Sequence, residues 1–373
     1  MRIAMIGAKG IPVEAGLSGG VERVVEELSR RLVERGHQVT VYARPYQNAK
    51  KRKRWEGVKI VTLPCLQFRY LETATHVFLC TIHALFQKYD VIHYHGVGPS
   101  IYAWIPRVFK PRTKIVVTFH VRDQFHELRH PLVRMVLAYG EWTAVRFPHA
   151  TIAVSRVIQD FCRLRFEKDV TLIPNAVTLP SKDPGTDRLT DFGLKPGKYL
   201  LGFGRLVQFK AFDVAIDAYR GVTSKMPFVI AGAPGYDKKY AERLLKSAGE
   251  DVRIRLVGFQ TGEDLKQLIA HAYAVVHPSR IEGMSLAVLE AMSYGKLVIM
   301  SDVPENREIA DHSAVVVTVD SDAAFRDAMN WAVSDPAMVK ERGSRAREFV
   351  TQNYSWTPVV NATEQLYKRL IRD

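Results

Sequence analysis

The segment GGVERVVEELSRRLVERGHQVTVYAR (residues 19–44), together with the apolar run Ile3–Gly7 before it, decides the fold of this chain. Apolar residues recur at helical spacing within it, at Val21, Val24, Val25, Leu28 and Leu32. This pattern predicts an amphipathic helix that begins at Gly19-Gly20 and ends at Gly36. A second apolar run, Val39–Ala43, follows, and the order strand, helix, strand is typical of a parallel βαβ unit.

The same alternation of Val- and Ile-rich runs with amphipathic segments continues along the chain. In the first half we expect strands at Ile3–Gly7, Val39–Ala43, Val58–Leu63, Val91–Tyr94, Ile115–Phe119 and Thr151–Val154. In the second half we expect them at Tyr199–Phe203, Phe228–Gly232, Arg253–Val257, Ala274–Val276 and Leu297–Met300. Two successive halves of this kind predict an α/β fold with two Rossmann-like domains and a cleft between them.

A chain of 373 residues exceeds the length at which one hydrophobic core usually stops growing. The segment LPSKDPGTDRLTDFGLKPGK (residues 179–198) fits neither periodic pattern, and we expect the link between the two domains there. Near the end of the chain, Trp356–Leu370 carries apolar residues at helical spacing, which predicts a helix docked on a surface.

Composition excludes several classes of protein. The chain is 47% hydrophobic and 25% charged, and no run approaches the roughly 18 apolar residues of a spanning helix. Its start, MRIAMIG, lacks the apolar core and cleavage site of a secretory signal. Cys65, Cys80 and Cys162 are widely spaced, which argues against a disulfide framework and a zinc site. We therefore expect a cytoplasmic protein.

The positive charge lies in the first half. Residues 1–180 hold 27 Lys and Arg against 14 Asp and Glu, whereas residues 181–373 hold 26 against 25. This asymmetry favours an acidic partner for the first domain, such as an anionic membrane surface, a phosphorylated acceptor or a nucleic acid. The run Lys50–Arg54 is its densest part, although a solvated loop explains that run equally well.

The first expected strand is followed by a glycine-rich loop that contains Gly7, Gly10, Gly16, Gly19 and Gly20. Such a loop before a helix can bring backbone N–H groups to a phosphate. It does not match GxGxxG, and the second strand ends in Ala43-Arg44 where a dinucleotide site would place an acidic residue. A nicotinamide enzyme is therefore disfavoured, while a glycine-rich connection without a ligand stays open.

The most informative motif is RIEGMSLAVLEAM (residues 280–292), which contains Glu282 and Glu290. Ser285 can cap a helix here, which would place Glu282 in a loop and Glu290 in the second helical turn. A carboxylate among apolar neighbours needs hydrogen-bond donors, and ribose hydroxyls would supply them. The alternative is a glutamate at the rim of an amphipathic helix.

Two further groups lie where strands are expected to end. Arg205 and Lys210 follow the strand at Tyr199–Phe203 and could clamp a diphosphate, or could be solvated loop charges. His120 follows another strand, and His93 and His95 end a third. Doubly wound folds bind ligands at such strand ends, although a histidine there is often structural.

Together these residues resemble the retaining glycosyltransferases of family four, which have the GT-B architecture. The hallmark of that family is two glutamates separated by seven residues, matched by Glu282 and Glu290. Its Gly-Arg-Leu with a downstream Lys is matched by Arg205 and Lys210, with Ala211 in place of the usual glycine. Ile173–Val177, which contains Asn175, resembles its Ile-Pro-Asn-Gly-Val. The opening of the chain resembles rhamnosyl- and hexosyltransferases of exopolysaccharide or O-antigen assembly.

The resemblance implies a role for each matched position. Glu290 would bind the ribose hydroxyls, Glu282 the hydroxyls of the donor sugar, and Arg205 and Lys210 the diphosphate, while His120 would lie beside the transferred sugar. The donor-binding residues implied by the family are completed by Gly19, Gly20, Asn175, Gly283, Met284 and Ser285.

The resemblance also implies a domain division in which the last helix crosses back to the first domain. The acceptor-side domain would comprise residues 1–180 with about 356–373, and the nucleotide-sugar-binding domain residues 181–355. The enzyme would transfer a hexosyl group from a nucleotide-diphosphate sugar to a glycan or lipid-linked acceptor in cell-surface polysaccharide biosynthesis. It would act with retention, without a metal or other cofactor, and with peripheral contact at the inner face of the membrane.

Several alternatives stay open at this point. Asp320-Ser321-Asp322 matches the DxD of metal-dependent transferases, but we interpret it as a turn and helix cap. The segment His120–His126 departs from the His-Gly, acidic residue and Trp of related enzymes, which leaves the acceptor open. A nucleotide-sugar epimerase of the same architecture and a basic nucleic-acid-binding module are the rival functions.

Overall fold

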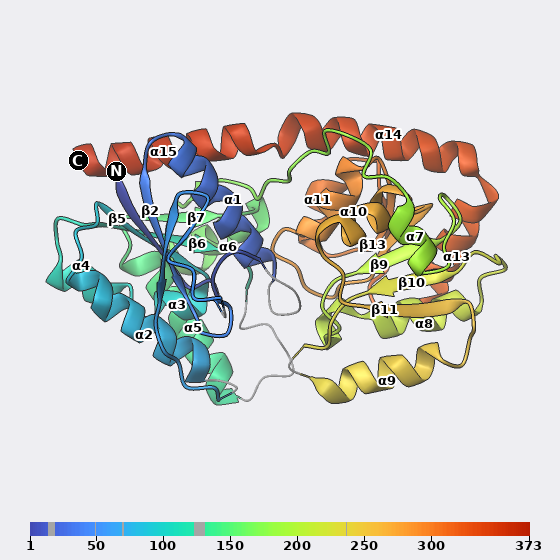
Figure 1. The fold of residues 1–373 in the computed structure, drawn as a ribbon, viewed down its shortest axis with the longest axis horizontal. Coiled ribbons are helices and arrows are strands. Elements are labelled where there is room, and N and C mark those ends of the chain that lie inside the picture. Colours follow the sequence, from blue (N-terminus) through green and yellow to red (C-terminus); the bar gives the residue numbers. More distant parts are fainter. Residues whose placement is uncertain (14–18, 49, 69–70, 123–130, 236) are drawn as a thin grey trace. The chain divides into compact units, whose positions relative to one another are not determined.

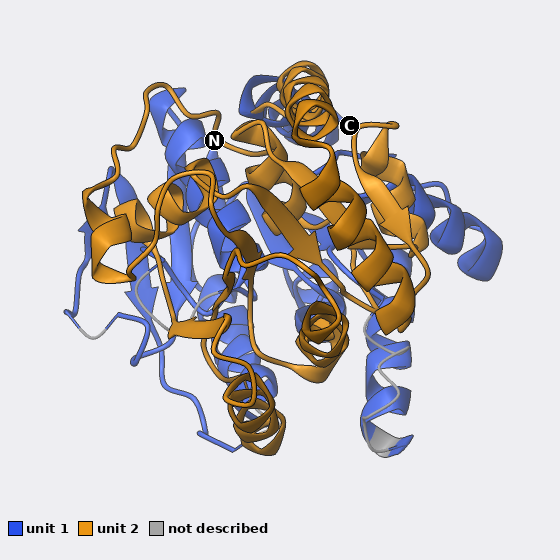
Figure 2. Ribbon diagram, turned by 90° about the vertical axis from the view of Figure 1, so that its right-hand side faces the viewer, with its two compact units in different colours: residues 1–175, 356–373 blue, residues 176–355 orange. Residues whose placement is uncertain are grey.

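The computed structural model describes residues 1–13, 19–48, 50–68, 71–122, 131–235 and 237–373. The chain divides into two compact units, shown in different colours in Figure 2. Unit 1 comprises residues 1–175 and 356–373, and unit 2 comprises residues 176–355. Each unit contains a largely parallel sheet with helices around it, so the predicted α/β class with two Rossmann-like domains is confirmed.

Unit 1 is built on an eight-stranded sheet in the order β3-β4-β2-β1-β5-β6-β7-β8 (Figure 1). Its strands are β1 Arg2–Ile6, β2 Gln38–Ala43, β3 Arg54–Trp55, β4 Val58–Thr62, β5 Val91–His95, β6 Lys114–Phe119, β7 Ala150–Ala153 and β8 Thr171–Leu172. Its helices are α1 Gly20–Glu34, α2 Leu71–Leu85, α3 Val97–Ser100, α4 Trp104–Phe109, α5 Pro131–Arg146, α6 Arg156–Phe166 and α15 Trp356–Arg372. The six expected strands are present, and β3 and β8 are additional short ones.

Unit 2 is built on a six-stranded parallel sheet in the order β11-β10-β9-β12-β13-β14. Its strands are β9 Leu200–Phe203, β10 Phe228–Ala231, β11 Ile254–Gly258, β12 Ala274–His277, β13 Leu297–Ser301 and β14 Val315–Val317. Its helical segments are α7 Asp187–Asp191, η2 Gln208–Lys210, α8 Phe212–Arg220, α9 Lys238–Ala248, α10 Gly262–Ala270, α11 Leu286–Ser293, α12 Pro304–Ala310, α13 Asp322–Ser334 and α14 Pro336–Asn353. The five expected strands are present, and β14 is additional.

In each sheet the strand order reverses direction at one point. In unit 1 the chain moves outward from β1 through β2, then restarts on the other side of β1 with β5. In unit 2 it moves from β9 through β10 to β11, then restarts beside β9 with β12. The crossover segments diverge at such a point and leave a crevice at the carboxyl ends of the strands, where open α/β sheets bind their ligands.

Helix α1 forms as its sequence predicts. Gly19 is its N-cap residue, and its buried side chains include Val24, Val25, Leu28 and Leu32. Gly36 follows the helix with a φ of 84°, a left-handed conformation that favours glycine.

The proposed link at residues 179–198 is wrong. The structure divides the units between Asn175 and Ala176, and the Pro- and Gly-rich segment lies within unit 2, where residues 187–191 form α7. Leu189 of α7 is 1% exposed, and the side chain of Gln267 on α10 accepts a hydrogen bond from the Arg188 N–H. A single helical turn held by one buried leucine is too short to produce a periodic signal.

Helix α15 packs within unit 1, against α1 and β6. It buries Val359, Val360 and Tyr367, and the Arg31 guanidinium of α1 lies 4.9 Å from the centre of its Trp356 ring. The helices of the described residues include none long and apolar enough to cross a membrane.

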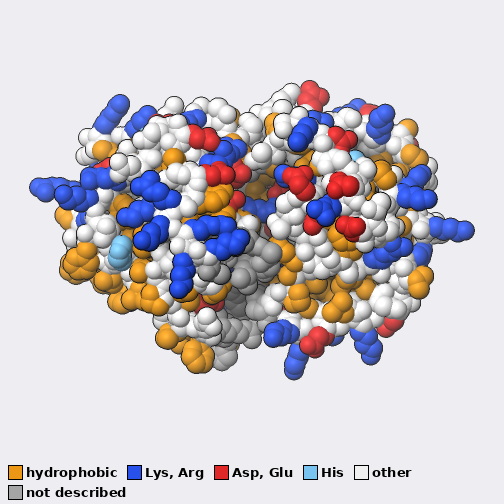
Figure 3. All heavy atoms as spheres, viewed as in Figure 1, with side chains coloured by type: hydrophobic (Ala, Val, Ile, Leu, Met, Phe, Trp, Pro, Cys, Tyr) orange, Lys and Arg blue, Asp and Glu red, His pale blue; other side chains and the backbone are white. Residues whose placement is uncertain are grey.

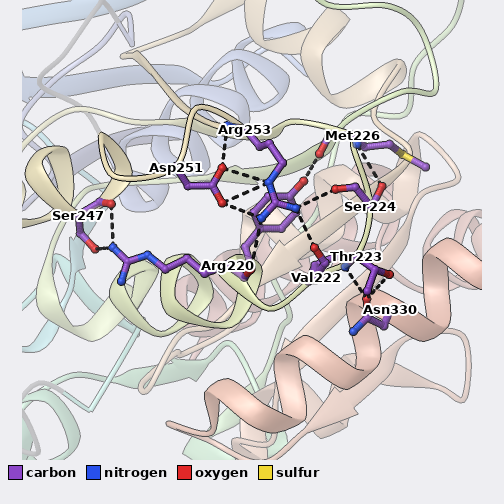
Figure 4. A network of polar contacts seen from close by, with 10 residues as sticks. Arg220, Val222, Thr223, Ser224, Met226, Ser247, Asp251, Arg253 and Asn330 are labelled. Carbon is purple, nitrogen blue, oxygen red and sulfur yellow. Dashed lines mark hydrogen bonds and ion pairs between the residues drawn. The ribbon is translucent and has the colours of Figure 1, made fainter.

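Arg253 holds the amino-terminal edge of the unit 2 sheet (Figure 4). Its guanidinium donates to the carbonyl oxygens of Val222 and Ser224, at 2.7 and 2.9 Å, and to the Asp251 carboxylate at 2.7 Å. These bonds join the turn after α8 to the residues before β11. Because this edge is opposite to the carboxyl ends of the strands, we assign Arg253 a structural role.

We predict that Arg253→Met lowers the free energy of unfolding by about 1–3 kcal/mol, because the carbonyl groups and Asp251 lose a charged donor. Urea unfolding at neutral pH measures the effect. Arg243→Met, at an exposed position of α9, is the matched control and should change stability by less than ~0.5 kcal/mol. Equal effects of the two substitutions would contradict the structural role.

Candidate active site

The reversal point of unit 2 brings two loops together. One loop connects β9 to α8 and contains Lys210, and the other connects β12 to α11 and contains Glu282. The two strands are neighbours in the sheet, and the Lys210 Nζ lies 2.5 Å from the Glu282 Oε1. The Glu282 side chain is 9% exposed. A buried ion pair, rather than two independent loop charges, therefore lies at this point.

His277, which the sequence analysis did not select, completes this cluster. Its Nε2 lies 2.8 Å from the Glu282 Oε1 and 3.1 Å from the hydroxyls of Ser279 and Ser285. A carboxylate accepts hydrogen bonds, so the His277 Nε2 carries the proton. The signal in the sequence was its position at the end of β12, the same criterion that selected His120.

The cluster keeps Glu282 ionised. Burial by itself would raise the pKa of the Glu282 carboxyl, but the positive charge of Lys210 and the hydrogen bond from His277 hold that pKa far below its usual value. Burial lowers the pKa of His277, against the opposing effect of Glu282. At neutral pH the site therefore presents a fixed carboxylate beside a lysine.

Arg205 and Lys210 lie on the same aromatic ring. The Arg205 guanidinium carbon is 5.6 Å from the centre of the Phe209 ring, and the Lys210 Nζ is 5.8 Å from it. Arg205 is exposed, whereas Lys210 is half-buried. Ala211, which replaces the family's glycine, adopts φ 49°, the left-handed conformation that favours glycine at this position.

Arg280 ties the two loops together. Its backbone N–H donates to the Phe209 carbonyl at 2.8 Å, and its guanidinium donates to the Gln208 carbonyl at 2.5 Å. The same guanidinium pairs with Asp320 at 2.5 Å. Ser321 caps α13 by accepting from the Ala324 N–H, so the interpretation of residues 320–322 as a turn and helix cap is confirmed.

The predicted helix start after Glu282 is confirmed as well. Ser285 is the N-cap of α11 and accepts a hydrogen bond from the Val288 N–H at 3.4 Å. Gly283 and Met284 are buried in the loop before it, and Glu290 is half-buried in the second turn of α11. The structure thus groups Glu282, Ser285 and His277 with Lys210, and Phe209 brings Arg205 beside Lys210, while Glu290 lies on α11, the helix that Ser285 caps.

Unit 1 has a second constellation at the carboxyl ends of β1, β5 and β6. Gly7 follows β1 with a φ of 112°, and a Cβ atom there would lie 2.6 Å from the His95 carbonyl oxygen. The glycine-rich loop therefore passes directly against the end of β5, which any larger residue would prevent. Gly16 lies outside the described residues.

Glu22 of α1, a second residue that sequence analysis missed, holds both ends of this loop. Its carboxylate accepts hydrogen bonds from the backbone N–H groups of Lys9, at 3.0 Å, and of Gly19, at 2.6 Å. Gly20, the first residue of α1, is exposed. Asn175, the last residue of unit 1, is 7% exposed.

His120 is paired with His95 at the ends of β6 and β5. The His120 Nε2 lies 3.2 Å from the His95 Nδ1, and the His95 Nε2 lies 3.5 Å from the Met5 sulfur. A thioether has no hydrogen to donate, so His95 satisfies both contacts when its Nε2–H faces Met5 and its Nδ1 accepts from His120. This arrangement places the proton of His120 on Nε2 and leaves its Nδ1 as an acceptor.

Both histidines are neutral. Burial holds the pKa of His95 well below its usual value, together with the neighbouring His93 and His120. Burial lowers the pKa of His120 to about 4, with the negative charge of Glu22 acting in the opposite direction. His93 lies between the hydroxyls of Tyr367, on α15, and Thr118, at 2.6 and 2.7 Å, which ties α15 to the sheet.

The described residues include no group of three or more His, Cys, Asp or Glu side chains placed to hold a metal ion. Residues 123–126 of the loop after His120 lie outside the described residues, so the departure noted there stays a sequence observation.

Two family models match most of the chain. The model for Glycosyltransferase Family 4 matches residues 18–179, and the model for Glycosyl transferases group 1 matches residues 191–349. The first match ends, and the second begins, close to the boundary between unit 1 and unit 2.

Curated relatives carry transferase names. The chain is 24% identical over 363 residues to the gpi3 subunit of phosphatidylinositol N-acetylglucosaminyltransferase from Schizosaccharomyces pombe, covering 94% of this chain and 77% of the relative. It is 29% identical over 273 residues to D-rhamnosyltransferase WbpZ of Pseudomonas aeruginosa, covering 69% of this chain and 68% of the relative.

Solved structures share the fold. Sucrose-phosphate synthase from Thermosynechococcus elongatus matches with a TM-score of 0.85 at 19% identity, covering 100% of this chain and 99% of that one. Anabaena HepE in complex with UDP and glucose matches with a TM-score of 0.81 at 19% identity, covering 99% and 100%. With both family models matched in sequence, this chain belongs to the group 1 glycosyltransferases of family four and is a glycosyltransferase.

Proposed function

We propose that this glycosyltransferase takes a hexosyl group from a nucleotide-diphosphate sugar and transfers it to a glycan or lipid-linked acceptor in cell-surface polysaccharide biosynthesis. The observation that carries the donor class is the grouping of Arg205, Lys210 and Glu282 at the reversal point of the unit 2 sheet. HepE, which shares the fold, has been solved with UDP and with UDP-glucose, which supports a nucleotide-sugar donor.

The diphosphate of the donor would contact cations and N–H donors, and its sugar and ribose hydroxyls would contact carboxylates. The cations of Arg205 and Lys210 stabilise the charge that builds on the leaving diphosphate as the sugar bond breaks. The backbone N–H groups that follow Gly283, at Met284 and Ser285, add donors at the start of α11. Glu282 accepts from hydroxyls of the sugar and Glu290 from those of the ribose.

Lys210 can serve the diphosphate without leaving Glu282. An ammonium group has three N–H donors, and one of them is occupied by the Glu282 carboxylate. Fixed protein charges of this kind are the basis for proposing transfer without a metal ion. Retention would follow from attack on the same face, with the leaving phosphate oxygen accepting the proton of the acceptor hydroxyl.

The unit 1 constellation serves the sugar and the acceptor. His120, neutral and with Nδ1 as an acceptor, binds a hydroxyl of the transferred sugar, and His95 positions it through the Nε2 contact. Gly20 offers its backbone N–H group to the phosphates, whereas the Gly19 N–H is bound by the Glu22 carboxylate and shapes the loop. Asn175 is the remaining donor-binding residue that the family resemblance implies. The phosphatidylinositol-directed and rhamnosyl-transferring names of the relatives support an acceptor of the lipid-linked or glycan class.

The proposed function predicts release of nucleoside diphosphate from one member of a panel of nucleotide sugars, in the presence of EDTA. Arg205→Ala and Glu290→Ala should each lower kcat/KM by about a hundredfold, since they remove a diphosphate cation and a ribose acceptor. Arg345→Ala and Glu263→Ala, at exposed positions of α14 and α10, are charge-matched controls. Donor turnover that EDTA abolishes, or that is indifferent to Arg205 and Glu290, would reject this assignment.

The ion pair predicts an effect of pH on stability. In the wild type, the depressed pKa of Glu282 stabilises the fold at every pH above the ordinary pKa of a glutamate. This contribution to the free energy of unfolding is lost as the pH falls below that value. In Lys210→Met, burial raises the pKa of Glu282 instead. The free energy of unfolding of this variant therefore falls as the pH rises through that raised pKa. The gap in unfolding free energy between the two should therefore widen from pH 5 to pH 7.5, reaching roughly 3–5 kcal/mol.

Urea unfolding at the two pH values measures this gap. Lys195→Met, at an exposed position of unit 2, is the control and should give a small gap that does not change with pH. A gap for Lys210→Met that is equally large at both pH values would show that Glu282 is not the titrating partner.

The histidine pair predicts a defined tautomer. Nitrogen-15 NMR of the wild type should show His120 protonated at Nε2 and unprotonated at Nδ1. His95→Leu removes the acceptor and should lower kcat by roughly tenfold, about the energy of one hydrogen bond. His95→Asn, whose amide oxygen can replace the Nδ1 acceptor, should retain the Nε2–H tautomer and more of the activity. Protonation of His120 at Nδ1 in the wild type would contradict the assignment.

A further inference from the structure

Helix α2 is apolar on both of its sides. Its inward side buries Val77, Cys80 and Ala84 beneath the rest of unit 1. Its outward side exposes Leu71, Phe78 and Leu79, and Phe86 follows directly after its last residue with 81% of its surface exposed. A surface helix normally places polar residues outward, because apolar surface in water is unfavourable. The outward side of α2 therefore lacks the composition of a solvated surface.

Helix α4 extends this apolar side. The Lys110 ammonium, one residue after α4, donates to the Ala84 and Leu85 carbonyls at the end of α2, at 2.9 and 3.1 Å. This contact places the ends of the two helices side by side. Val108 and Phe109, which are 60% and 67% exposed, therefore lie near Phe86. We call the six residues Leu71, Phe78, Leu79, Phe86, Val108 and Phe109 the α2 stripe.

The α2 stripe is long and is not matched in unit 2. From residue 71 to residue 86 a helix rises about 22 Å. Among the described residues of unit 2, the exposed large apolar side chains are Leu245, Val252 and Val316, which lie on separate elements. Isolated residues of that kind are normal on a protein surface, whereas a contiguous apolar surface marks an interaction site.

The charges around the α2 stripe have one sign. Glu72 is the single charged residue of α2, and its carboxylate pairs with Arg44 at 3.0 Å. Helix α4 contains Arg107 and no acidic residue, and Lys88 and Arg112 are exposed just after the ends of the two helices. Figure 3 shows hydrophobic side chains along the lower edge of unit 1, where α2 and α4 lie, with Lys and Arg side chains beside them.

From this combination we infer that the α2 stripe is a docking surface for an anionic lipid bilayer. Aromatic and aliphatic side chains on one side of a helix, with flanking cations and no free carboxylate, match helices that lie in the plane of a membrane surface. The apolar side chains enter the boundary between headgroups and acyl chains, and Lys88, Arg107 and Arg112 contact the lipid phosphates. This inference rests on the proposed function, because docking on a bilayer would give the enzyme access to a lipid-linked acceptor.

The test is sedimentation of the full-length protein with vesicles, in the absence of any sugar donor. Vesicles of phosphatidylcholine alone are compared with vesicles that also contain phosphatidylglycerol. We expect the wild type to bind the anionic vesicles, and Phe86→Ser/Phe109→Ser to bind them roughly tenfold more weakly. Leu245→Ser/Val252→Ser, which removes two exposed apolar residues of unit 2, is the matched control and should bind as the wild type does.

Three outcomes would overturn the inference. The wild type could fail to bind either vesicle, or Phe86→Ser/Phe109→Ser could bind as tightly as the wild type, which would assign binding to charge elsewhere. Alternatively, the wild type could dimerise in sedimentation velocity through a contact that the Phe86→Ser/Phe109→Ser variant loses, which would assign the α2 stripe to a second copy. Release of nucleoside diphosphate in solution should be the same in both double variants, so loss of vesicle binding and failure of the proposed enzyme activity are separate results.

Discussion

Parallel strand pairing is the constraint on which both candidate sites depend. A parallel pair requires a crossover that returns the chain to the starting edge, so every strand of a parallel sheet ends at the same edge. In each unit the order of the strands reverses once, at β1 and β5 in unit 1 and at β9 and β12 in unit 2. The carboxyl ends of these four strands and of β6, with the loops that follow them, carry the glycine-rich segment, the histidines, the cations and the paired carboxylate. The chemistry is thus gathered by topology from residues far apart in sequence.

The two constellations differ in how their groups are stabilised. In unit 2 a carboxylate is buried, which is unfavourable without compensation, and Lys210 and His277 supply the charge and the hydrogen bond that keep it ionised. In unit 1 the histidines at the strand ends are neutral imidazoles, which need hydrogen-bond partners rather than counter-charges, and the buried Glu22 carboxylate is satisfied by two backbone N–H groups. The Lys210 cation that Glu282 holds in place has the charge that the proposed diphosphate donor requires. A neutral imidazole with a free acceptor suits a sugar hydroxyl.

Two helices of unit 1, α15 and α2, differ in how their apolar sides are covered. Helix α15 packs on unit 1, and its buried Tyr367 hydroxyl forms a hydrogen bond with His93 in the sheet. The last helix of the chain therefore belongs to the same unit as the histidine pair. On α2 the apolar residues continue around the outward side, where no other described element of unit 1 covers them. The excess of Lys and Arg in residues 1–180, evident in the sequence, thus accompanies an apolar surface that composition alone does not reveal.

The sequence by itself determined those features that depend on residues close together in the chain. The strand positions, the span of α1 from its glycines and its apolar spacing, and the cap of α11 at Ser285 all follow from local patterns. The family resemblance rests on Glu282 and Glu290, eight positions apart. Only the tertiary structure decided which distant groups meet. Lys210 and Glu282 are 72 residues apart, and Met5 and His95 are 90 residues apart. It also showed that residues 187–191 form a helix where the composition predicted a link, and that Glu22 binds both ends of the glycine-rich loop. Local patterns report the preferences of the backbone and the side that a helix buries, whereas hydrogen-bond partners, burial and the resulting pKa values arise when separate elements pack against each other.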